Sequence, residues 1–223
     1  MGLDVTVVVV DWRRLEDTPP GRRLALLECA LDEDADRCRC GARCADGRCD
    51  GGAGCWDCPD CADPDAGWIP PRAAGQPWYL AYEFTLTCGS FKPHFWAGER
   101  WEELRDAPAA HRVRGALDAF LAGLLWVPPG EEDTPEPLLA AVPDRPGAPL
   151  LVSAAPTAVA PRADAWRRAA PHLTDLRAPF DARPARPNSW METYEEFARL
   201  VGEWGEVVTA AEHRGWGVVG LGR

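Results

Sequence analysis

The chain has 223 residues, of which 46% are hydrophobic and 26% charged, a composition suited to one globular domain with a sizeable core. Its formal net charge of −11 and the lack of a basic stripe argue against nucleic-acid binding. No apolar run approaches the ~20 residues that a membrane-spanning helix needs, and the first twelve residues do not form a signal peptide. We therefore expect a cytoplasmic protein that does not bind membranes.

The first predicted element is a strand over residues 5–12 (VTVVVVDW). Its β-branched residues occupy both faces, which is typical of a central strand covered on both sides. A short helix is predicted after the Pro-Pro-Gly sequence at residues 19–21. The apolar stripe of this helix consists of Leu24, Leu27 and Leu31.

Residues 78–87 (WYLAYEFTLT) alternate between two faces, which predicts a second strand. One or two helical turns are predicted over residues 98–106, and a longer helix over residues 111–126. The apolar stripe of the longer helix consists of Val113, Leu117, Phe120, Leu121 and Leu124. Residues 127–149 are acidic and proline-rich, which indicates a loop.

The C-terminal part begins with a short predicted strand over residues 150–153. A helix is expected to start after Pro161, and Pro171 should kink or divide it. The sequence SWME at residues 189–192 resembles a capping box, so we expect another helix directly after it.

That last helix is expected to end at Gly215, and residues 216–221 (WGVVGL) predict a final strand. Pairing of the final strand with the first one would bring the chain ends together. The expected fold class is α/β or α+β, with residues 1–223 in a single domain. A small mixed β-sheet is expected to be flanked by helices.

Seven cysteines fall in a segment that has almost no aliphatic side chains. They are Cys38, Cys40, Cys44, Cys49, Cys55, Cys58 and Cys61. Such a segment cannot bury enough apolar surface to offset the entropy lost on ordering. Thiols stay reduced in the cytoplasm, which favours a bound metal over disulfides. We therefore predict a Cys-rich metal-binding insertion over residues 36–63.

Zn²⁺ is the favoured metal because structural zinc sites use four tetrahedral thiolate or imidazole ligands. An iron–sulfur cluster is an alternative. Cys55, Cys58 and Cys61 match the first three ligands of the bacterial ferredoxin pattern, but the fourth is absent from its expected place. Another soft metal, and free or disulfide-bonded cysteines without metal, remain open.

A second group of reactive side chains lies within residues 82–101 (YEFTLTCGSFKPHFWAGERW). Here Cys88 and His94 could form an activated thiolate, and Glu83 could orient the pair or act as a base. Lys92, the one lysine of the chain, is the fourth candidate. Except for Glu83, we expect these residues in a loop after the strand. The structural alternatives are a packed cysteine, a hydrogen-bonded histidine and a solvated lysine.

The opening MGLDVTV, the central GSFKPHFWAGERW and the closing RGWGVVGL resemble a group of uncharacterised actinobacterial proteins. The resemblance covers nearly the whole chain except the Cys-rich segment. It implies a single bacterial domain and carries over no activity and no catalytic residue.

The expected function is that of a zinc-binding accessory or interaction protein with an unknown protein or small-molecule ligand as partner. A binding module would present the KPHFW segment and tryptophans as an apolar patch rimmed by charge. The alternatives are a small-molecule enzyme with a site around Glu83, Cys88, Lys92 and His94, and a thiolate metal store or sensor.

Overall fold

The valine-rich strand β1 (Val5–Val10) lies at the centre of a five-stranded sheet. The computed structural model describes residues 5–35, 67–69, 77–84, 91–130, 150–183 and 189–222, and in it the strand order is β2-β3-β1-β5-β4. The other strands are β2 (Trp68–Ile69), β3 (Tyr79–Tyr82), β4 (Leu150–Ala154) and β5 (Gly217–Gly222). Every pairing among these strands is antiparallel, whereas a mixed sheet was expected.

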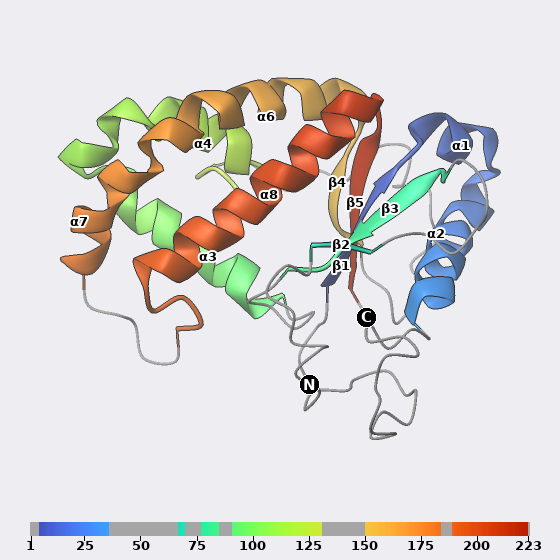
Figure 1. Ribbon diagram of the computed structural model, residues 1–223, viewed down its shortest axis with the longest axis horizontal. Helices are drawn as coiled ribbons and strands as arrows, with labels where there is room; N and C mark the ends of the chain where they lie inside the picture. The colour runs from blue at the N-terminus through green and yellow to red at the C-terminus, as the bar shows by residue number, and fades with distance from the viewer. Residues whose placement is uncertain are drawn as a thin grey trace, which may run out of the picture.

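Helices cover both faces of the sheet, so the expected single domain is of the α+β type (Figure 1). On one face lie α1 (Trp12–Asp17) and α2 (Pro20–Ala35). On the other lie α3 (Lys92–Leu104), α4 (Arg114–Leu121), α6 (Pro156–Ala169), α7 (Arg177–Asp181) and α8 (Tyr194–Arg214). No helix in the described ranges has the length and apolar character required to cross a membrane.

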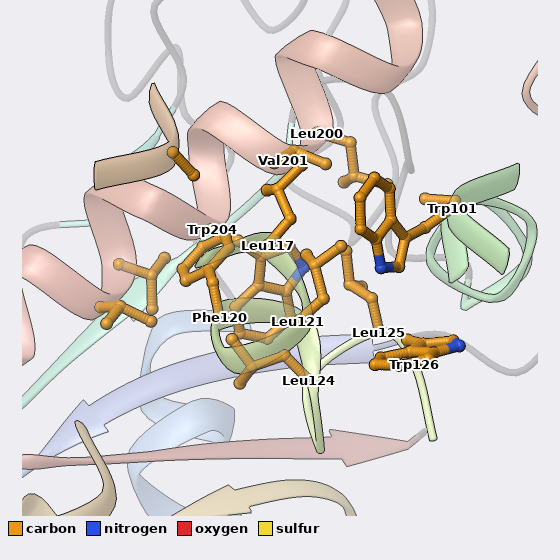
Figure 2. Close-up of a cluster of buried hydrophobic side chains, with 14 of the residues drawn as sticks. Trp101, Leu117, Phe120, Leu121, Leu124, Leu125, Trp126, Leu200, Val201 and Trp204 are labelled. Carbon is orange, nitrogen blue, oxygen red and sulfur yellow. The ribbon is translucent and has the colours of Figure 1, made fainter. Parts of the chain in front are cut away.

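The core is divided by the sheet into two clusters, because successive β1 side chains point to opposite faces. Val7 and Val9 belong to the larger cluster, under α3, α4 and α8, and Val8 and Val10 to the smaller one, under α1 and α2. Figure 2 shows part of the larger cluster, to which α3 contributes Trp101, α4 contributes Leu117 and α8 contributes Trp204. The expectation of a strand covered on both sides is confirmed.

Several other expectations for the C-terminal part are confirmed. β5 pairs with β1, with Val5 opposite Gly222, so the two ends of the domain lie together. Helix α8 ends at Gly215, whose positive φ of 65° belongs to the left-handed region that favours glycine. Pro171 lies in a 3₁₀ helix, η3 (Ala170–Leu176), that separates α6 from α7.

Two helix starts differ from expectation. Helix α6 begins at Pro156 and contains Pro161, although proline removes a helical hydrogen bond. Tertiary packing compensates, because Val159 and Ala163 on the same helix are fully buried in the larger cluster. The capping box of α8 is formed by Thr193 and Glu196, not by residues 189–192.

The expected helix over residues 111–126 is shorter in the structure. A 3₁₀ helix, η2 (Pro108–Arg112), precedes α4, which ends at Leu121. Gly123 then adopts a φ of 72° and turns the chain. The predicted insertion over residues 36–63 and residues 131–149 of the predicted acidic loop lie outside the described residues.

The close approach of Gly98 on α3 to the backbone of Leu125 can be tested by substitution. A Cβ atom at Gly98 of α3 would lie 2.0 Å from the backbone oxygen of Leu125. We therefore expect Gly98→Ala to lower the free energy of unfolding by about 1–3 kcal/mol, measured by urea denaturation.

Gly202 of α8 is the matched control, because nothing lies within 4 Å of a Cβ atom there. Alanine favours a helix interior over glycine, so Gly202→Ala should raise the free energy of unfolding by about 0.5–1 kcal/mol. Equal effects of the two substitutions would contradict the packing of α3 described above.

Candidate functional site

The KPHFW segment forms the first turns of helix α3 and not the connecting loop that the sequence analysis expected. Lys92 is the first helical residue, and His94 and Glu99 lie in the same helix. Pro93 explains the difference, because proline is well tolerated in the first helical turn, where its missing N–H group has no intrahelical partner. A proline that suggests a loop therefore marks a helix start here.

His94 is buried between α3 and α8, with only 1% of its surface exposed. Its Nδ1 atom accepts a hydrogen bond of 3.1 Å from the indole Nε1 of Trp204. The ring also packs edge-on against Phe84, with 4.8 Å between centroids, and stacks on Phe91 at 6.0 Å. This environment agrees with the interpretation of His94 as a hydrogen-bonded structural histidine.

Burial sets the protonation state of His94. Loss of water around the ring lowers the pKa of His94 to about 3, so the imidazole is neutral at physiological pH. Because Nδ1 is an acceptor, the proton of the neutral ring lies on Nε2. Nε2 has no hydrogen-bond partner among the residues that the structure describes. An imidazole with this pKa is poorly suited to proton transfer near pH 7.

The other candidates occupy different environments. The side chain of Lys92 is exposed, and its Nζ atom lies 4.9 Å from the ring centroid of Trp190, just before α8. Glu83 follows β3, is half-buried, and its backbone N–H donates to the carbonyl of Gly67 at 2.9 Å. Phe84, the residue after Glu83, packs against the ring of His94.

All the candidate metal ligands, and Cys88 with them, lie outside the described residues. The structure therefore does not place Cys38, Cys40, Cys44, Cys49, Cys55, Cys58 or Cys61. Within the described ranges, no three His, Cys, Asp or Glu side chains gather in a way that could hold a metal ion.

A partly buried polar contact between the sheet and α8 was not predicted. The hydroxyl of Tyr82 on β3 donates to Oε2 of Glu206 on α8 at 3.1 Å. Burial, followed by the negative charges of Glu203 and Glu206, raises the pKa of Tyr82 far above its ordinary value of 10, so the hydroxyl stays protonated. Alternation in residues 78–87 predicted a strand that includes Tyr82, but nothing in the sequence identified the glutamates of α8 as neighbours of its hydroxyl.

Comparison with known proteins gives no assignment: no family model, no curated protein and no solved structure matches the chain.

The environment of His94 predicts a specific pH dependence. In the unfolded chain the histidine returns to a pKa near its ordinary value of 6.5, so it binds a proton there that the folded protein excludes. The contribution of His94 to stability should therefore be fully present above pH 6.5 and be lost as the pH drops toward 3. This one site contributes a slope of up to about 1.4 kcal/mol per pH unit to the free energy of unfolding.

His94→Gln should remove that contribution while its amide oxygen still accepts the Trp204 hydrogen bond. Urea denaturation between pH 4 and 7 would measure the slope. His172→Gln is the matched control, because the His172 side chain is 40% exposed. An unchanged slope in His94→Gln would contradict a neutral buried imidazole.

Proposed function

We propose that the protein is a zinc-binding accessory or interaction protein whose metal is held by the Cys-rich insertion over residues 36–63. The observation that carries this proposal is the density of cysteines: seven lie between residues 38 and 61, among almost no aliphatic side chains. A segment of this composition needs a cross-link or a metal to become ordered.

Zinc fits this donor set better than an iron–sulfur cluster. Cys38, Cys40, Cys44 and Cys49 supply four sulfur ligands from a short stretch, which is the number that a structural zinc site uses. The segment lacks histidine, so a site inside it would be rich in thiolates, which bind soft metals. The run from Cys55 to Cys61 lacks the fourth cysteine of the ferredoxin pattern.

The place of the insertion supports a structural role for the metal. The insertion falls between α2, which ends at Ala35, and β2, which begins at Trp68. Among the described residues, the clusters on both faces of the sheet consist mainly of valines, leucines, alanines and aromatic residues. Zinc contributes roughly 10–16 kcal/mol to the folding of small finger peptides, which is ample to order a segment of this length.

The described residues around the KPHFW segment favour interaction over catalysis. His94 is enclosed and neutral, whereas Lys92 lies at the surface against Trp190. Phe95, one helical turn after Lys92, is 50% exposed, and Trp190 is 51% exposed. We call Lys92, Phe95 and Trp190 the Lys92–Trp190 surface. Exposed aromatic side chains next to charges are typical of protein interaction sites.

Elemental analysis tests the metal part of this proposal. Protein purified without added metal and under exclusion of air should contain about one or two zinc ions per chain and show a colourless spectrum. Changing Cys38, Cys40, Cys44 and Cys49 together to serine should lower the zinc content, because a thiolate site loses affinity when its ligands are removed.

Cys29→Ser is the matched control, because Cys29 belongs to α2 and not to the cysteine cluster. It should leave the zinc content unchanged. Iron with a broad visible absorption band would replace this proposal with a redox function. Full-length protein without any metal would overturn it.

A further inference from the structure

The Lys92–Trp190 surface joins two elements that are distant in the sequence. Lys92 and Phe95 lie one turn apart on α3 and are therefore neighbours on the helix surface. Trp190 lies in the segment that leads into α8, and the contact between the Lys92 ammonium and its indole ring connects the two elements. Half of each aromatic side chain is accessible to a partner.

An open hollow of about 370 Å³ adjoins Trp190. It is lined by Ser189, Trp190, Glu192 and Glu196. Its volume is at the lower end of the range for ligand sites, ~300–1,000 Å³, which suits one long side chain better than a large cofactor. Trp190 contributes an indole to its lining, Glu192 and Glu196 contribute carboxylates, and Ser189 is the fourth lining residue.

The carboxylates beside the hollow differ in how firmly they are held. Glu196 accepts hydrogen bonds from the backbone N–H groups of Glu192 and Thr193, both at 2.9 Å, which fixes its carboxylate at the start of α8. The side chain of Glu192 is exposed. The hollow thus combines one fixed negative charge with one that can adjust to a ligand.

The protein itself shows which kind of group the Trp190 ring binds. The Nζ atom of Lys92 lies 4.9 Å from the ring centroid, within the ~6 Å range of a cation–π interaction. Glu192 and Glu196 line the same hollow as this indole, so a second cation bound in the hollow would lie near their carboxylates. A guanidinium group is the best match, because it stacks on aromatic rings and forms paired hydrogen bonds with carboxylates.

We propose that this hollow binds an arginine or lysine side chain of a partner protein, with the cation between the indole of Trp190 and the carboxylate of Glu192. This inference rests on the interaction part of the proposed function and is independent of the zinc site. Charge complementarity supports a basic partner, because the net charge of the chain is −11 and would attract a positively charged segment over a distance. Phe95 extends the contact beyond the hollow.

NMR titration with a small peptide, acetyl-Gly-Arg-Gly-amide, tests the proposal on the full chain. The indole N–H signal of Trp190, assigned as the one that disappears in Trp190→Phe, should shift and saturate in the millimolar range. The same peptide with citrulline in place of arginine is neutral and should cause no saturable shift.

Glu192→Gln and Glu16→Gln form a matched pair of variants. Both change the net charge by the same amount, but Glu16 is exposed on α1, on the other side of the sheet. Glu192→Gln should weaken arginine binding about fivefold, the effect of one well-placed surface charge, and Glu16→Gln less than twofold. Equal weakening in the two variants would mean nonspecific attraction and would overturn the proposal.

Two further outcomes would also overturn it. One is an unchanged Trp190 signal at saturating peptide. The other is a shift of this signal with protein concentration alone, which would mean that a second copy of the chain occupies the surface. Zinc content measured on the same samples separates this inference from the proposed metal site, because either property can fail while the other is retained.

Discussion

The fold depends on one strand that has no exposed face. β1 pairs with β3 on one side and β5 on the other, and Val7, Val8, Val9 and Val10 are completely buried. Such a strand is stable only when helices cover both faces of the sheet, so α1 with α2 and the layer of α3 to α8 are both required. Because β1 and β5 are the first and last of the described strands, the centre of the sheet forms only when these distant segments pair. A long segment between α2 and β2 is compatible with these pairings, because the entropic cost of lengthening a loop grows slowly.

Buried tryptophans account for much of the polar arrangement in the helical layer. Each large indole that is buried needs an acceptor for its N–H group. Trp101 donates to Asp118 at 2.9 Å, Trp126 to Glu102 at 2.7 Å and Trp204 to His94 at 3.1 Å. His94 thus serves the same purpose as the two carboxylates, but at a fully enclosed position between α3 and α8. There a neutral acceptor costs less to bury than a charged one, which explains a histidine at this position without catalysis.

The sequence predicted the elements whose pattern is set by their own residues. The consecutive valines of β1 and the long apolar stripe of α8 with Gly215 at its end identify their structures locally. Sequence analysis failed where contacts between distant segments determine the structure. Pro161 is tolerated in α6 because the helix is buried on the core, and the antiparallel order of the sheet follows from contacts that no local pattern encodes. Likewise, the sequence could not identify Trp204 as the hydrogen-bond donor to His94, because the two residues are 110 positions apart.

The helical state of the KPHFW segment also bears on the choice between an enzyme and an interaction protein. In a loop, Lys92 and His94 could turn toward one another; in a helix, residues two apart point to nearly opposite sides, because each residue rotates the chain by about 100°. Accordingly His94 is buried against α8, and Lys92 lies outside, on Trp190. A pocket that used both side chains would require the first turn of α3 to unwind. That would expose Phe84, Phe91 and Trp204, which now enclose the imidazole, to solvent. The same turn of α3 therefore buries His94 and exposes Lys92 and Phe95 to solvent. This arrangement favours a surface that a partner could contact over an active site that uses both Lys92 and His94.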